Sequence, residues 1–325
     1  MQFTLVPENY ASAYAPLVYE FSDNEAPRDL TVEVSEAGSG ELIFRKRLLN
    51  TSAGAVDIAP LLRHRLELAP QAGPTGFLPA GSRMAAVRVA VEGVEEVRIF
   101  RFAERGHETA YRLCSTMPPV RLIAPGEMEE LTLLPGVVRA ELDVVLPSGS
   151  ETRHYTSDYA AGWSLFRLDC RTLLPQTERL VLRFYDGGDH CLLSLGYTVV
   201  PPPDKGTRIA WYSRRGSIEH YTFPVRELWC ERQTRGEVRL ADGKSRLAEA
   251  SAGQELTVVS AYERRAVREA LCEIGTSPAV WLVSPTGVYR PVTVVADDRE
   301  IVRRGRLEAM RFTFRSTGKG ETLWS

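Results

Sequence analysis

The sequence has no long apolar run and no cluster of cysteines, and these absences exclude several classes of protein. No stretch of about eighteen apolar residues occurs, so no segment is predicted to span a bilayer. The N-terminus, MQFTLVPENYASAYAPLVYEF, lacks a basic region followed by an apolar core, which predicts synthesis in the cytoplasm without a signal peptide. Free thiols in a reducing compartment are predicted, rather than disulfides or a zinc site, because the five cysteines are scattered: Cys114, Cys170, Cys191, Cys230 and Cys272.

Net charge is also small, at −2 over 325 residues. Binding of nucleic acid requires a concentrated basic surface that neutralises phosphates, so nucleic acid is not an expected partner, and insertion into a membrane is not expected either. Lysine is scarce, since four of the 40 basic residues are lysines and 36 are arginines. Arginine suits protein interfaces, but its even spread along the chain favours biased codon usage in a GC-rich genome.

Motifs that carry chemistry are missing. The five histidines form no HxH or HExxH pattern, and no GxSxG, GxxxxGK[ST] or GxGxxG occurs. Asp186, Asp189 and His190 could hold a metal across one turn, but a solvated turn explains the same residues. The sequence therefore predicts no catalytic, cofactor-binding or metal-binding residues, no cofactor and no enzyme activity.

One acidic cluster, Glu127, Glu129 and Glu130, contains the paired carboxylates that glycoside cleavage uses. It follows Pro125-Gly126, which is typical of a turn. We interpret the cluster as a charged loop.

Alternation of apolar and polar residues with a period of two dominates the chain and predicts a mainly β protein. We expect two to three β-sandwich-like domains in tandem, over residues 1–115, 116–203 and 204–325, with one short helix in the C-terminal domain. A short helical segment that Asp57 caps is also expected over 57–65. Strands are expected at 31–35, 41–45, 84–92, 96–102, 131–134, 137–146, 164–168, 179–185 and 191–200.

Two hairpins and a helix are expected beyond the proline-rich connection Pro201–Pro203. Strands at 208–212 and 220–223 flank a turn with Gly216, and strands at 236–240 and 245–249 flank Asp242-Gly243. In the earlier 185–190 turn, Gly187 and Gly188 are expected to supply the positive φ values. The helix is expected over 261–274, and later strands at 279–283, 288–295 and 307–315. Ser260 and Glu263 have the spacing of a capping box at its start.

The richest aromatic set of the chain lies in and just after the segment RIAWYSRRGSIEHYTFP, residues 208–224. Trp211 and Tyr212 must face opposite sides of a sheet, so one of them is exposed or covered by another domain or subunit. The set either forms an interface or stacking platform or fills a sandwich core. Its candidate interface or core residues are Trp211, Tyr212, Gly216, Tyr221, Phe223 and Trp229.

The string W-Y-S-x-x-G-x-I-x-x-Y-T-F, residues 211–223, resembles a segment of tail proteins from phages and prophages of gut anaerobic bacteria. Three further stretches are similar to the same group: RLIAPGEMEE at 121–130, AVDIAPLL at 55–62, and the helix followed by Ser277-Pro278 and PVTV within 261–294. Together these stretches cover most of the chain in order.

The resemblance implies a structural component of a tail or baseplate that acts by protein–protein assembly with itself and other tail proteins, in the virion, after synthesis in the bacterial host. Contacts between different faces of identical subunits make rings when they close. An alternative is a carbohydrate-binding or host-adhesion module that stacks its aromatic residues on a glycan receptor. A glycan hydrolase is a third hypothesis, for which the sequence offers no convincing pair of carboxylates.

Overall fold

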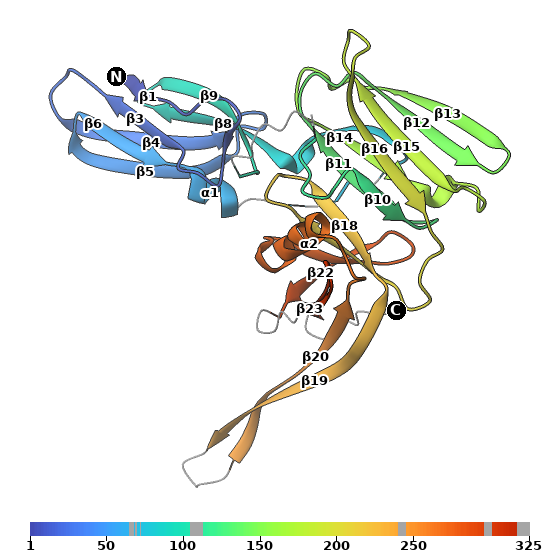
Figure 1. The fold of residues 1–325 in the computed structure, drawn as a ribbon. Helices are drawn as coiled ribbons and strands as arrows, with labels where there is room; N and C mark the ends of the chain where they lie inside the picture. Colours follow the sequence, from blue (N-terminus) through green and yellow to red (C-terminus); the bar gives the residue numbers. More distant parts are fainter. Residues whose placement is uncertain are drawn as a thin grey trace. The chain divides into compact units, whose positions relative to one another are not determined.

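The computed structural model describes residues 1–64, 68, 70–71, 73–104, 113–239, 245–295 and 301–316 (Figure 1). Strands make up 56% of the chain and helices 8%, so the protein is mainly β, as the alternation predicts. Its strands form several separate sheets, which build multiple β domains. No helix within the described ranges is both long and apolar enough to cross a bilayer.

The chain divides into two compact units. Unit 1 comprises residues 1–69, 79–110 and 214–216, and unit 2 comprises residues 70–78, 111–213 and 217–325. The strands of the expected middle and C-terminal domains thus both fall within unit 2. The division into domains at 1–115, 116–203 and 204–325 stays a prediction.

Unit 1 contains a three-stranded sheet of order β1-β3-β6 and a five-stranded sheet of order β2-β9-β8-β4-β5. Alternate side chains of β3 and β4 are buried, among them Tyr19 and Phe21 of β3 and Val32 and Val34 of β4. Its elements are β1 (Gln2–Leu5), β2 (Ala11–Ser12), β3 (Val18–Ser22), β4 (Arg28–Glu36), β5 (Leu42–Thr51), β6 (Ala53–Asp57), α1 (Ala59–His64), η1 (Gly81–Arg83), β8 (Met84–Val91) and β9 (Val94–Arg101).

Asp57 fixes the start of α1, as the sequence predicts. Its Oδ1 accepts hydrogen bonds from the backbone N–H of Ala59, at 3.0 Å, and of Leu17, at 2.9 Å. The first bond satisfies one of the free N–H groups at a helix start. Ile58 and Leu62 are buried beside it, so the short helix is held by packing as well as by its cap.

A β-sandwich forms the first part of unit 2. One sheet has the order β10-β16-β15-β12-β13, and the second has the order β11-β14-β7. Their inward residues share one core, in which the rings of Phe77, Phe166 and Phe184 meet edge to face. The elements are β7 (Gly76–Pro79), β10 (Val120–Ile123), β11 (Met128–Leu133), β12 (Arg139–Leu146), β13 (Gly149–Thr156), β14 (Ser164–Asp169), η2 (Cys170–Thr172), β15 (Arg179–Tyr185) and β16 (Cys191–Val199).

The turn between β15 and β16 differs in detail from the prediction. Its positive φ belongs to Asp189, at 62°, and not to Gly187 or Gly188. Asp186 Oδ1 accepts bonds from the backbone N–H groups of Gly188 and His190, so a short polar side chain organises this turn.

The second part of unit 2 is a larger sheet of order β18-β17-β21-β22-β24-β20-β19, with β23 on β24. Leu271 and Ile274 pack on its apolar face with Trp211, Phe223 and Phe314. The elements are β17 (Thr207–Tyr212), β18 (Ile218–Phe223), β19 (Val225–Arg239), β20 (Ser245–Val259), α2 (Arg265–Cys272), η3 (Glu273–Thr276), β21 (Val280–Val283), β22 (Tyr289–Val294), β23 (Ile301–Arg304) and β24 (Leu307–Ser316).

The predicted start of the C-terminal helix is wrong. The helix begins at Arg265, after Arg264 as N-cap, and Ser260 and Glu263 do not form a capping box. Ser260 Oγ instead donates to the Ala261 carbonyl at 2.7 Å and accepts the Met310 N–H at 2.9 Å. The backbone of Glu263 pairs with that of Glu308, so a tertiary strand contact replaces the first helical turn.

Candidate functional site

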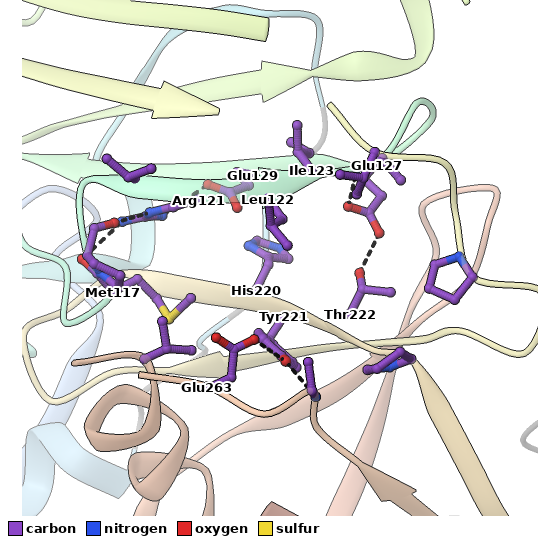
Figure 2. A pocket seen from close by; sticks show the side chains of 18 residues that line it. Met117, Arg121, Leu122, Ile123, Glu127, Glu129, His220, Tyr221, Thr222 and Glu263 are labelled. Carbon is purple, nitrogen blue, oxygen red and sulfur yellow. Dashed lines mark hydrogen bonds and ion pairs between the residues drawn. The ribbon is translucent and has the colours of Figure 1, made fainter. Parts of the chain in front are cut away.

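Unit 2 contains a pocket of about 230 Å³ beside the free edge of β10, which we call the edge pocket (Figure 2). β10 lies on one side of it, β18 on another, and the chain leading into α2 closes the base. The pocket is lined by Met117, Pro118, Val120, Arg121, Leu122, Ile123, Ala124, Glu127, Glu129, Val200, Pro203, His220, Tyr221, Thr222, Pro224, Ala261, Glu263 and Val267. Most of these side chains are apolar. Of the polar ones, Arg121, Glu129, His220 and Thr222 lie on strands, and Glu127 and Glu263 lie in connecting segments.

β10 is an edge strand whose one neighbour in the described sheet is β16, to which it is parallel. Gly196 N–H donates to the Pro119 carbonyl and Val200 N–H to the Ile123 carbonyl, both at 2.9 Å. Because alternate residues of a strand face the same neighbour, the peptide groups of Val120 and Leu122 face the open edge. Such an edge is a template for another strand.

The side chains of the same two residues are exposed apolar groups. Val120 is 71% exposed and Leu122 is 63% exposed, whereas Arg121 and Ile123 between and beside them are buried. An open strand edge with exposed aliphatic side chains is usually protected in a soluble protein. The edge pocket therefore combines backbone groups and apolar surface that a partner segment can cover.

A buried cluster of charges lies behind the pocket. Arg121 Nη1 is 3.0 Å from Glu129 Oε2 and 3.9 Å from Glu219 Oε2. Its other guanidinium nitrogens donate to Ser115 Oγ at 2.7 Å and to the Pro118 carbonyl at 2.9 Å. One arginine thus neutralises two carboxylates, from β11 of the sandwich and β18 of the larger sheet, and joins the two parts of unit 2.

Arg208 makes a second connection between the same two sheets. Its Nη1 is 2.8 Å from Glu127 Oε2, and its Nη2 donates to the Met128 carbonyl at 2.7 Å. Thr222 Oγ1 donates to the other carboxylate oxygen of Glu127, and Figure 2 shows this pair at the pocket wall. These bonds fix the wall of the pocket that β18 provides.

The interpretation of Glu127, Glu129 and Glu130 as a charged loop is wrong. Glu129 and Glu130 lie in β11 and are buried, at 3% and 2% exposure, and Glu127 lies in the turn before that strand. Glu127 and Glu129 are paired with arginines. Buried carboxylates of this kind require such partners, so these two are structural ion-pair members rather than free acids.

Burial shifts the pKa values of two neighbouring residues of β18 in opposite directions. Desolvation raises the pKa of Glu219, and the charge of Arg121 and hydrogen bonds from Thr116 and Ser115 partly oppose this. Desolvation lowers the pKa of His220 well below 6.5, and the charges of Arg208 and Arg121 add to the effect. His220 is therefore neutral in the folded protein near pH 7.

We expect acid to destabilise unit 2 through His220. The unfolded protein binds a proton at His220 below pH 6.5 and the folded protein does not, so this contribution to stability is present above pH 6.5 and is lost as the pH falls. The expected slope is about 1.4 kcal/mol per pH unit. Urea unfolding at a series of pH values measures it, with His220→Gln as the matched variant.

The Gln variant keeps a neutral polar group for the hydroxyl of Tyr289, which lies 2.8 Å from His220 Nε2. Glu219 titrates in both proteins and in the opposite sense, because its raised pKa gives stability that is lost as the pH rises. The difference between the two proteins therefore reports His220. Equal slopes in both would contradict the assignment.

Glu263 presents a carboxylate to the pocket from the chain before α2. The Tyr221 hydroxyl donates to its Oε1 at 2.7 Å and accepts the Ala261 N–H at 3.1 Å, as Figure 2 shows. Among the residues that the structure describes, no Lys, Arg or His forms an ion pair with Glu263. This carboxylate can accept a cation from a partner.

The structure places the aromatic residues of the 208–224 segment mainly in the interior. Trp211 and Phe223 belong to the core of the larger sheet, and each has 0% exposure. Tyr212 on the opposite face is also buried, at 1%, while Tyr221 is partly buried at the edge pocket. These rings leave no exposed stacking pair.

Two further candidate residues of this segment differ in what the structure describes. Gly216 lies in the turn between β17 and β18 with φ of 93°, a conformation that favours glycine, and it confirms the predicted hairpin turn. The side chain of Trp229 lies outside the described residues, although its backbone belongs to β19.

β19 and β20 continue far beyond the sheet from which they start. β20 pairs with β24 over Glu255–Val259, but its pairing with β19 runs on from Gln254 to Ser245. Residues 231–239 and 245–254, which we call the distal ribbon, therefore pair with no third strand in the described structure, and Figure 1 shows them projecting from the sheet. At about 3.3 Å per residue the distal ribbon is about 30 Å long.

Sequence reasoning missed the role of Arg121, Arg208, Glu219 and His220. Glu219 and His220 occupy unspecified positions of the W-Y-S-x-x-G-x-I-x-x-Y-T-F string, and nothing in a single sequence distinguishes a buried ion pair from a surface one. The Asp186 and His190 side chains, in contrast, pair with each other at 3.1 Å in a solvated turn. The predicted Asp242-Gly243 turn and the tail after Ser316 lie outside the described residues.

Comparison with known proteins does not assign this chain to a family. No family model matches the chain, and no curated protein matches it. Residues from three stretches noted in the sequence, 121–130, 211–223 and 261–294, line the edge pocket.

Proposed function

We propose that this chain is a structural component of a phage or prophage tail or baseplate, and that it acts by assembly with copies of itself and with other tail proteins. It performs no catalysis in this role and needs no cofactor. Its final location is then the virion tail. The resemblance of its four stretches to tail proteins supports a role in a phage or prophage tail. One structural feature supports a role in assembly.

The distal ribbon carries the proposal. An isolated two-stranded hairpin is marginally stable in water, because it has no third strand and no core face to bury. Both of its long edges also expose backbone N–H and C=O groups, which are ready to pair with another chain. A ribbon of about 30 Å that leaves its own sheet is therefore best explained as an arm that is stabilised by contact with another subunit.

The two other functions have less support. A glycan-binding platform needs exposed aromatic rings, and Trp211, Tyr212 and Phe223 are buried. A retaining or inverting hydrolase needs two carboxylates that are free to act on either side of a sugar bond. Glu127 and Glu129 are instead neutralised by Arg208 and Arg121.

Removing the distal ribbon is expected to abolish self-association without unfolding the protein. The sharpest deletion replaces residues 231–254 with Asn-Gly, because Cys230 pairs with Glu255 and a two-residue turn can join directly opposite residues. All pairs between β20 and β24 are kept. Light scattering across a concentration series compares the mass of the shortened and full chains.

Circular dichroism and thermal melting of the same samples serve as the control for folding. A folded monomer in place of the full-length oligomer is the expected result. An oligomer of unchanged size after the deletion would show that the arm does not carry assembly.

A further inference from the structure

We propose that the distal ribbon of one copy adds to the free edge of β10 in a second copy and covers its edge pocket. This inference rests on the proposed function, because it names the surface on which the arm assembles. The contact joins two different surfaces of identical chains, so it is head to tail. Such contacts make closed rings or continue as filaments, depending on the rotation between subunits.

The backbone of β10 provides the first argument. Val120 and Leu122 direct their peptide N–H and C=O groups away from β16, and no described strand pairs with that edge. Within the described structure, the distal ribbon likewise pairs with no third strand. Pairing them satisfies both sets of groups at once, as in other cases of strand addition.

The side chains at the two surfaces are complementary. At the receiving edge, exposed Leu122 and the Glu263 carboxylate both line the edge pocket, and Glu263 has no cationic partner in the described part of the chain. At the end of the arm, Val238 is 53% exposed and Arg239 beside it is also exposed. The end of the arm thus carries an aliphatic residue and a cation on opposite faces of its strand, and the receiving edge carries an apolar surface and an anion.

Geometry excludes the arm of the same copy as the occupant. Pro224, which immediately precedes β19, lines the edge pocket, so the strand that carries the arm starts there. Arg239 is fifteen residues further along an extended strand, which places the end of the arm roughly 50 Å away at about 3.3 Å per residue. Figure 1 shows the ribbon leading away from the sheet, so its end reaches only a pocket of another copy.

A charge placed on the receiving edge tests the inference. Leu122→Arg is expected to weaken self-association by roughly tenfold or more, because it puts a hydrated cation where an apolar contact forms. Leu122 is 63% exposed, so folding is not at risk. The matched control is Leu49→Arg in unit 1, where the leucine is 69% exposed. Sedimentation equilibrium of the full-length variants gives the association constants.

Exchange of charges gives a second readout. Glu263→Lys alone and Arg239→Glu alone are each expected to weaken association, and the two changes in one chain are expected to restore much of it. A structural role of Glu263 through Tyr221 alone would give no such restoration.

Crosslinking locates the contact directly. One preparation carries Leu122→Cys and the other carries Val238→Cys, both with the exposed Cys191 changed to Ser. After mixing, mild oxidation is expected to join residue 122 of one copy to residue 238 of the other, as mass spectrometry of the linked peptides shows. An oligomer without this link overturns the inference.

The outcomes separate this inference from the proposed function. If the shortened chain is a monomer but Leu122→Arg assembles normally, the arm assembles elsewhere and only the receiving edge is wrong. If Leu49→Arg weakens association as much as Leu122→Arg, the loss reflects added charge and the edge is again wrong. If the shortened chain still assembles, or the full chain stays monomeric at every concentration, both proposals fail.

Discussion

Trp211→Ala is expected to lower the free energy of unfolding of unit 2 by about 3–5 kcal/mol, since removal of a buried tryptophan leaves a large cavity. Trp211 has 0% exposure and lies in one core with Phe223, Leu271 and Phe314. Within the described structure its Nε1 has no hydrogen-bond partner, so the loss is one of packing. Urea unfolding followed by far-ultraviolet circular dichroism measures it.

Trp211→Phe is the matched control. It keeps an aromatic ring in the core and removes no hydrogen bond, so it is expected to cost clearly less than the alanine variant. Comparable stability of the alanine variant and the native protein would mean that Trp211 is not a core residue. If the alanine variant were as stable as the native protein but no longer assembled, Trp211 would instead contribute to an interface between subunits.

Arg121→Met is expected to destabilise unit 2 by about 3–5 kcal/mol near neutral pH, because it leaves uncompensated charge in a buried site. Arg121 and its partners Glu129 and Glu219 all have side chains that are 3% exposed or less. Methionine is apolar and of similar length, so the change tests the charge rather than the volume.

The pH dependence of this loss separates charge from packing. Without the guanidinium, the pKa of Glu219 in the folded state rises further, and the stability that comes from its protonated form is lost as the pH rises. The difference between variant and native protein is therefore expected to shrink as the pH falls toward the ordinary carboxyl pKa of 4.5. A difference that is equal at all pH values would indicate lost packing alone.

Strands that bury one face could be predicted from the sequence. β15 (Arg179–Tyr185) has the predicted bounds, and β16 and β17 differ from theirs by one residue each. In β15 the buried residues Leu180, Leu182 and Phe184 alternate with more exposed ones, and that periodicity is the physical signal that a half-buried strand leaves.

The full length of the distal ribbon could not be predicted, because its sequence lacks this alternation. The sequence indicates strands at 236–240 and 245–249, whereas β19 starts at Val225 and β20 ends at Val259. Its segments ERQTRGE and AEASAGQE are polar or small throughout. In these segments apolar and polar residues do not alternate, so no period of two marks the strands.

The edge pocket depends on partners that are distant in sequence. β10 contains four residues, and its parallel neighbour β16 begins at Cys191. Strand pairing over such a distance in sequence leaves no local pattern. Arg121 and Glu219 look like ordinary charged residues in the sequence, and only the fold shows that they approach each other. The capping-box pattern of Ser260 and Glu263 failed similarly, because contacts with Met310 and Glu308 override the local preference.

Assembly of this chain with itself is tested most directly by its mass in solution, from light scattering between micromolar and near-millimolar concentration. We predict a discrete oligomer whose mass is a whole multiple of 36.2 kDa, with a ring in negative-stain images where the head-to-tail contact closes. A mass of one chain at every concentration would contradict self-assembly through the arm.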